Sequence, residues 1–224
     1  MEQTRTRAEK ALRALATGLL VLAGFTSTAQ AQLVQTVTTH DKTLVVTDPS
    51  TGSKSFHGWG KFPSPSTPIR KIKMVVQFGC PDSVRCADWD YMDQIFIRRK
   101  GGQNAPDLQY EIGRMLTPYG GAFGKNWNFT WETDLTDFSL LLRDSVEVEY
   151  RHPGWEPNTD RGWKVTVKFE ITQGPPALPP IAIHRIYDGQ FAYGDPSKPI
   201  EEALKPVSFT SNAKSRIGRL LVYQ

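Results

Sequence analysis

The sequence predicts an all-β protein: an antiparallel jelly-roll-like β-sandwich, followed by the start of a second sandwich at the C-terminus. Strand-like runs recur at short intervals and are separated by turns rich in Gly and Pro, which is typical of sandwiches and jelly rolls. Only one stretch has a helical pattern, whereas a parallel α/β fold would need several crossover helices. A proline-rich segment then separates a long first part from a short last part.

Residues 1–31 have the pattern of a signal peptide. A basic start is followed by an apolar run from Ala14 to Phe25, and Ala29-Gln30-Ala31 matches the small-x-small cleavage pattern, so that Gln32 would begin the mature chain. The apolar run is shorter than the roughly 20 residues that span a bilayer. We therefore expect a secreted or periplasmic bacterial protein with no membrane contact after cleavage. The alternative is an uncleaved anchor.

Residues 32–174 are predicted to form the first domain. Its strands alternate apolar and polar residues or are rich in β-branched ones. A turn is expected at Asp48–Gly52, and a loop at Phe62–Pro68, because its three prolines cannot donate to a ladder. Thr136 is expected to cap a short helix over Asp137–Arg143. The predicted strands are Leu33–Thr39, Thr43–Thr47, Ile69–Phe78, Asp90–Arg99, Leu108–Met115, Val146–Tyr150 and Trp163–Ile171, with further turns at Gly101–Gly102 and Ala105–Asp107.

Residues 175–180 are predicted to be a linker, since the run Gly174-Pro-Pro-Ala-Leu-Pro-Pro180 is stiff and extended. Strand-like runs follow at Ile181–Tyr187 and Ile217–Tyr223. Residues 181–224 are short for an independent domain. We expect them to be the truncated beginning of a second β domain that packs poorly or lies along the first.

Charge and histidine placement exclude several functions. The formal net charge of +4 falls to about +2 once the leader is removed. No basic stripe carries interleaved aromatics, so nucleic acid is not an expected partner. The histidines do not stand at metal-ligand spacing, and we expect neither a metal nor a cofactor. They are His40, His57, His152 and His184.

The segment Cys80–Asp90 carries the densest chemical signal. Cys80 and Cys86 have five residues between them and are the only cysteines. In an exported protein such a pair is expected to form a disulfide, and half of a zinc site is the disfavoured alternative. Asp88 and Asp90 follow on either side of Trp89. If they lie on a strand, they would share one face, with Asp88 the structural member of the two.

This segment and Tyr110–Tyr119 resemble the N-terminal domain of the peptide-N-glycosidase F family, bacterial enzymes that hydrolyse the glycosylasparagine amide. The similarity runs in order from roughly Thr38 to Pro175. Further matching pieces are Ile72–Met74, Asp134–Phe138, Tyr150–Trp155 and Gly174-Pro175.

The resemblance implies two jelly-roll sandwiches with a catalytic cleft between them, and an N-linked glycoprotein or glycopeptide as substrate. It places the principal catalytic aspartate at Asp90. We expect Trp89 and Trp155 to bind sugar, and the flanking aromatics to desolvate Asp90 in part. Tyr91 stands where the family has arginine. No glutamate falls at the family's second position near Tyr150.

The resemblance also implies that most of the second domain is missing from this chain, so the site is expected to be incomplete. The alternative function is therefore a non-catalytic sandwich that binds glycan or a partner protein. A copper mono-oxygenase-like sandwich is a remote alternative, disfavoured because histidine ligand pairs are absent. Glu111 and Arg114 are expected to form a surface or cross-strand ion pair, and His152 to be a loop residue.

Overall fold

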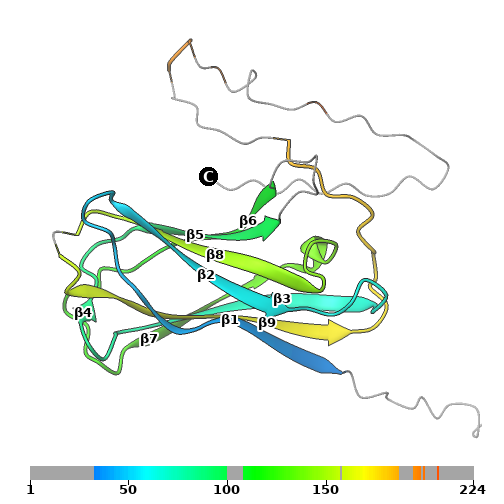
Figure 1. Ribbon diagram of the computed structural model, residues 1–224, viewed down its shortest axis with the longest axis horizontal. Helices are drawn as coiled ribbons and strands as arrows, with labels where there is room; N and C mark the ends of the chain where they lie inside the picture. Colours follow the sequence, from blue (N-terminus) through cyan, green and yellow to red (C-terminus); the bar gives the residue numbers. More distant parts are fainter. Residues whose placement is uncertain are drawn as a thin grey trace, which may run out of the picture. The chain divides into compact units, whose positions relative to one another are not determined.

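The computed structural model describes residues 33–99, 108–156, 158–186, 194–197, 199 and 206. They form two β-sheets that face each other (Figure 1). The predicted all-β sandwich is confirmed. The elements are β1 Val34–Val45, β2 Ser53–Lys61, β3 Ile69–Gly79, β4 Arg85–Cys86, β5 Met92–Arg99, β6 Leu108–Leu116, β7 Asn128–Asp134, the 3₁₀ helix η1 Thr136–Phe138, β8 Ser145–Pro153 and β9 Arg161–Gln173.

The chain crosses repeatedly between the two sheets, as in a jelly roll. One sheet has the order β1-β9-β3-β7, with β4 added at the start of β9, and the other has the order β2-β8-β5-β6. All pairs are antiparallel except β4 with β9. Among the described strands, only β5 and β6 are both consecutive and paired. The core is therefore built from contacts between residues far apart in sequence.

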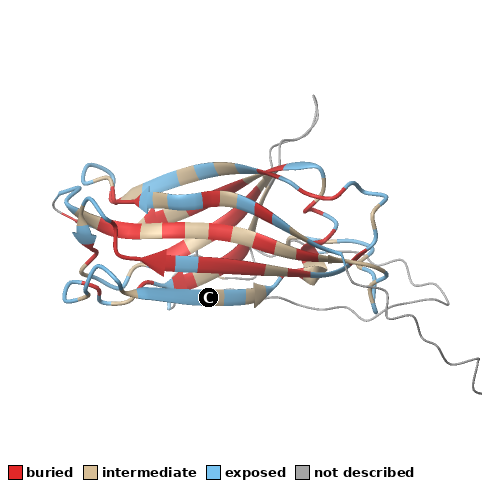
Figure 2. Ribbon diagram, turned by 90° about the horizontal axis from the view of Figure 1, so that it is seen from below, coloured by how far each residue is buried: buried red, intermediate tan, exposed pale blue. Residues whose placement is uncertain are grey.

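Strand β9 shows how the core forms. Its alternating residues Val165, Val167, Phe169 and Ile171 are almost wholly buried, as their period of two predicts. Buried positions alternate with more exposed ones along the strands in Figure 2. Each such side chain contributes about 1.5–3 kcal/mol when it leaves water.

The first strand is continuous where two runs were predicted. Strand β1 spans both runs, and its register with β9 shifts between Thr38 and His40 and between His40 and Thr43. Lys42 takes a positive φ of 49° at this irregularity. The predicted break thus corresponds to a bulge inside one strand. The polar residues between the two runs indicated an irregularity, but not that the strand continues through it.

Three strands were missed: β2, the two-residue β4 and β7. Strand β2 contains Gly58 and Gly60, which weaken any strand pattern. At Gly58, however, a Cβ would lie 2.0 Å from the carbonyl oxygen of Thr39, so glycine is required there by close packing. Strand β7 is mostly exposed, and such an edge strand lacks a run of buried residues to reveal it.

The predicted helix is reduced to one 3₁₀ turn, and its expected cap is wrong. Leu135 occupies the N-cap position without a side-chain cap. Thr136 instead donates to Asp134, through its N–H at 2.9 Å and its hydroxyl at 2.6 Å from Oδ1. This local turn competes with a full α-helix for the same donors.

Residues 181–186 have no regular secondary structure, although a strand was expected there. Ile183 packs against the core, and Arg185 Nη1 donates to the carbonyl oxygen of Gln109 on β6 at 2.7 Å. The segment therefore lies along the first domain. The predicted signal peptide, the turns predicted within residues 101–107, the strand predicted at Ile217–Tyr223 and most of residues 187–224 lie outside the described residues. No helix in the described part of the chain is long and apolar enough to cross a membrane.

The outer surface of the β2-β8-β5-β6 sheet is organised around Glu149 on β8. Its side chain is 3% exposed. It accepts from Ser55 at 2.7 Å, from Arg98 and Gln109 at 3.2 Å, and from Arg151 at 2.9 Å. Burial alone would raise the pKa of Glu149, but the hydrogen bonds from Ser55 and Arg151 prevail and hold it below its ordinary value.

We expect the Glu149→Gln variant to lose about 2 kcal/mol of unfolding free energy at pH 7. The partly exposed donors Ser55, Arg98 and Arg151 lose a buried, charged acceptor. A lowered pKa in the folded state gives stability that is present above the ordinary value of 4.5 and is lost as pH falls through the folded value. The difference from wild type should therefore shrink below pH 4.5. Urea unfolding at pH 7 and pH 3 measures it.

The matched control is Glu132→Gln, because Glu132 pairs with Lys73 but its side chain is 51% exposed. Its loss should be below about 0.5 kcal/mol. Equal losses in the two variants would contradict a special role for Glu149.

Candidate active site

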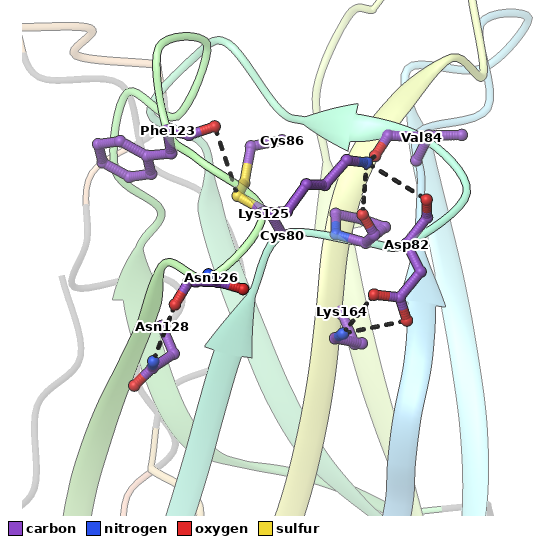
Figure 3. Close-up of a disulfide and its surroundings, with 10 residues drawn as sticks. Cys80, Asp82, Val84, Cys86, Phe123, Lys125, Asn126, Asn128 and Lys164 are labelled. Atoms are coloured by element: carbon purple, nitrogen blue, oxygen red, sulfur yellow. Dashed lines mark hydrogen bonds and ion pairs between the residues drawn. A yellow bond between two sulfur atoms is a disulfide. The ribbon is translucent and has the colours of Figure 1, made fainter.

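The site begins with a stapled turn. Cys80, at the end of β3, is bonded to Cys86 in β4, so the predicted disulfide is present. Within the turn, the ammonium group of Lys125 donates to the carbonyl oxygens of Pro81 at 2.8 Å and Val84 at 2.7 Å (Figure 3). A covalent bond and the ammonium group of one lysine thus fix the turn from two sides.

The turn rests directly on the start of β9. Strand β4 pairs with β9 in parallel, and the N–H of Ala87 donates to the carbonyl oxygen of Gly162 at 3.1 Å. The N–H of Gly120 in turn donates to the carbonyl oxygen of Ala87 at 2.9 Å. A Cβ at Gly120 would lie 2.4 Å from the buried ring of Trp163. Only a glycine at position 120 allows this loop to pack against both Ala87 and the ring of Trp163.

Asp88 is a structural carboxylate. It accepts two hydrogen bonds from Arg85, at 2.6 and 2.8 Å, and pairs with Arg161 of β9. Asp88 and Asp90 lie in the loop between β4 and β5 and not on a strand. The expected shared strand face is therefore absent, whereas the structural role of Asp88 agrees with these contacts.

Asp90 is exposed to solvent. The desolvation expected from its aromatic neighbours is therefore wrong for this structure. Its partner is the hydroxyl of Tyr119: the hydrogen bond and the negative charge of Asp90 raise the pKa of Tyr119 above its ordinary value. Tyr119 thus remains protonated and can donate to the carboxylate at neutral pH.

Three aromatic side chains are exposed on the loops around Asp90. Trp89 is 53% exposed, Tyr119 61% and Trp155 70%. The rings of Trp89 and Tyr119 meet edge to face, with centroids 6.2 Å apart. The indole of Trp155 lies over Gly52, where a Cβ would come within 2.5 Å of it. Exposed rings held at a carboxylate suit sugar binding, because a ring face packs against the apolar face of a sugar.

Tyr91 connects these loops. Its hydroxyl lies 3.0 Å from the carbonyl oxygen and 3.2 Å from the N–H of Trp155. Its own N–H donates to Thr117 Oγ1 at 2.9 Å, and its carbonyl oxygen accepts from the Thr117 N–H at 2.9 Å. The structure therefore joins Trp89, Asp90, Tyr119 and Trp155 into one region.

A buried polar group beneath this region was missed from the sequence. His152 Nδ1 lies 2.6 Å from Asp93 Oδ1, and the hydroxyl of Tyr150 contacts the other oxygen of Asp93. All three residues are fully buried. Burial raises the pKa of Asp93, and His152 opposes that rise. His152 lies on β8, so its assignment to a loop is wrong, and the adjacent Pro153-Gly154 misled that expectation.

Glu156 was also missed. It follows Trp155 and is 2% exposed. Burial raises its pKa, and the guanidinium of Arg161, 3.5 Å from Oε2, works against that rise. An acidic residue just past the aligned Tyr150–Trp155 run was the available signal. Through its pair with Arg161, Glu156 joins β9 to the site loops. Because it is buried, it does not reach a substrate in this conformation.

Removing the disulfide in a Cys80→Ser, Cys86→Ser variant should lower the unfolding free energy by about 2 kcal/mol, the chain-entropy value for so short a loop. Thermal unfolding with and without reductant measures it. Reductant should change the wild type and leave the variant as it is. A variant as stable as the oxidised wild type would show that the Lys125 contacts alone hold the turn.

No family model matches the chain. It is 32% identical over 130 residues to the peptide-N(4)-(N-acetyl-β-D-glucosaminyl)asparagine amidase F of Elizabethkingia miricola, a match that covers 55% of this chain and 32% of that protein. A recombinant peptide:N-glycanase F structure matches with a TM-score of 0.50 at 28% identity, over 64% of this chain and 43% of that one.

A crystal structure of the same named amidase matches with a TM-score of 0.51 at 28% identity, over 65% of this chain and 44% of that one. The chain thus spans about a third of the curated relative and less than half of each solved structure. The sequence comparison and the structure comparisons each cover more than half of this chain. This chain is therefore similar to the N-terminal domain of peptide-N-glycosidase F, as its motifs predict.

Proposed function

We propose that this chain carries the Asp90 half of an exported amidase that hydrolyses the bond between asparagine and N-acetylglucosamine in N-linked glycoproteins or glycopeptides. The observation that carries the proposal is the exposed carboxylate of Asp90, presented on a disulfide-anchored loop among the exposed rings of Trp89, Tyr119 and Trp155. The similarity to the amidase names the substrate class.

The chemistry requires one base and one acid. Asp90 accepts a proton from water as the water oxygen attacks the asparagine side-chain carbonyl carbon. The C–N bond of the resulting tetrahedral intermediate breaks, and the proton passes from Asp90 to the leaving nitrogen. The products are an aspartate side chain and a glycosylamine. Tyr119 holds Asp90 through its hydroxyl, and no metal is needed for either proton transfer.

The aromatic rings supply substrate position. Trp89 and Trp155 offer faces on which a pyranose ring packs, and their loops are joined through Tyr91. In this proposal residues 32–174 form the sandwich that presents Asp90, residues 175–180 are the linker, and residues 181–224 begin a second β domain. The other wall of the cleft belongs to that second domain.

The second candidate is a sandwich that binds glycan without cleaving it. The exposure of Asp90 favours it, because catalytic carboxylates act best where water is excluded and charges are less screened. The aromatic surface would then serve recognition alone. Binding and release of glycan, measured on one preparation, separate the two functions.

We expect Asp90→Asn to reduce glycan release from a denatured glycoprotein by about 10²–10⁴-fold, the usual contribution of a general acid–base group. The variant should still bind an asparagine-linked glycopeptide, because the rings of Trp89 and Trp155 remain. Mass spectrometry of released glycan and titration calorimetry with the glycopeptide measure the two effects.

The matched control is Asp41→Asn, an exposed aspartate on β1, which should release glycan at the wild-type rate. Equal release by wild type and Asp90→Asn would remove Asp90 from the mechanism. Binding without release by the wild type would establish the non-catalytic function, and neither binding nor release would reject both candidates.

A further inference from the structure

We infer that Tyr91, supported by the buried His152–Asp93 pair, is a positioning residue that fixes Asp90 relative to Trp155. The inference rests on the proposed function and deepens it, because it names what holds the carboxylate and the sugar platform in one geometry.

The backbone around Asp90 is fixed on both sides. Thr117, which is 2% exposed, exchanges two hydrogen bonds with Tyr91, each of 2.9 Å. The same threonine hydroxyl donates to the carbonyl oxygen of Trp89 at 3.1 Å. Asp90 therefore stands between two anchored residues, and its exposed carboxylate starts from a fixed backbone position.

The side chain of Tyr91 extends this anchoring to Trp155. Its hydroxyl donates to the carbonyl oxygen of Trp155 and accepts from the N–H of the same residue, at 3.0 and 3.2 Å. Gly154 allows this approach: its φ is 152°, and a Cβ there would lie 2.5 Å from the tyrosine ring. The hydroxyl of Tyr91 thus fixes the position of both the N–H and the carbonyl group of Trp155.

The buried group supports the ring from beneath. His152 meets Tyr91 edge to face, with centroids 5.7 Å apart and an interplanar angle of 84°. Asp93 holds the imidazole through Nδ1, and Tyr150 holds Asp93. Because His152 and Asp93 are 0% exposed, they cannot touch a substrate. They act on the site only through what they contact.

The charges near Tyr91 keep its hydroxyl protonated. Burial raises the pKa of Tyr91, and the nearby carboxylate of Glu156 raises it further. The phenol therefore remains a donor to Trp155 across the neutral range. A tyrosine that merely filled space would need only its ring, whereas here the hydroxyl makes two hydrogen bonds that a phenylalanine cannot.

The Tyr91→Phe variant tests this role, because it keeps the ring against His152 and removes only the hydroxyl. We expect kcat for glycopeptide hydrolysis to fall by about 10–100-fold, the effect of a small misplacement of reacting groups, with KM changed by less than about threefold. In ¹⁵N NMR spectra, the Trp155 amide resonance should shift upfield as its hydrogen bond is lost.

The second variant, Gly154→Ala, should give the same loss of kcat by pushing the ring away from Trp155. Tyr110→Phe, a partly buried tyrosine on β6, is the control and should match the wild type. Wild-type kcat and an unmoved Trp155 resonance in Tyr91→Phe would overturn the inference. If the wild type proves inactive, the proposed function fails, while the Trp155 resonance still decides whether Tyr91 positions that residue.

Discussion

The start of β9 is the constraint on which the rest of the structure depends. Trp163 is wholly buried in the core, and the residues just before it carry the site. The carbonyl oxygen of Gly162 accepts a hydrogen bond from the N–H of Ala87, and Arg161 pairs with both Asp88 and Glu156. The strand that pairs with β1 and β3 through the core thus also supports the disulfide turn. A shift of β9 by one residue would expose the core face and move the site loops together.

This arrangement separates rigidity from exposure. The residues beneath the site are buried and tied by a disulfide, a buried histidine–carboxylate pair and glycines that allow close contact. The side chains above them, Trp89, Asp90 and Trp155, remain exposed. The proposed recognition of a bulky glycan would need such accessible groups, and precise orientation would need the fixed residues beneath them. The loops satisfy both requirements because each is anchored through its backbone.

The sequence predicted the fold class, most strands and the cysteine pair, since a period of two and local spacing determine these. It failed where the deciding contact is distant in the chain. Gly58 in β2 is explained only by Thr39 across the sandwich. His152 became a buried partner of Asp93 through the pairing of β8 with β5. Asp90 was expected to be partly desolvated, but flanking aromatic residues cover a carboxylate only if their rings fold over it. Here Trp89 is exposed and the ring of Tyr91 packs against His152 instead.

The residue at position 91 then gives the site its own electrostatic character. The resemblance implies an arginine there, which would place a permanent cation and a planar fork of donors beside Asp90. Tyr91 is neutral, and its hydroxyl is engaged by the Trp155 backbone. The nearby guanidinium of Arg161 is already shared by Asp88, Asp160 and Glu156. The partner of Asp90 is thus the hydroxyl of Tyr119, so this exposed carboxylate is held by a hydrogen bond and not by a cation at position 91. In the proposed mechanism, any strengthening of Asp90 as a base would therefore come from the substrate or from a second wall of the proposed cleft that excludes water.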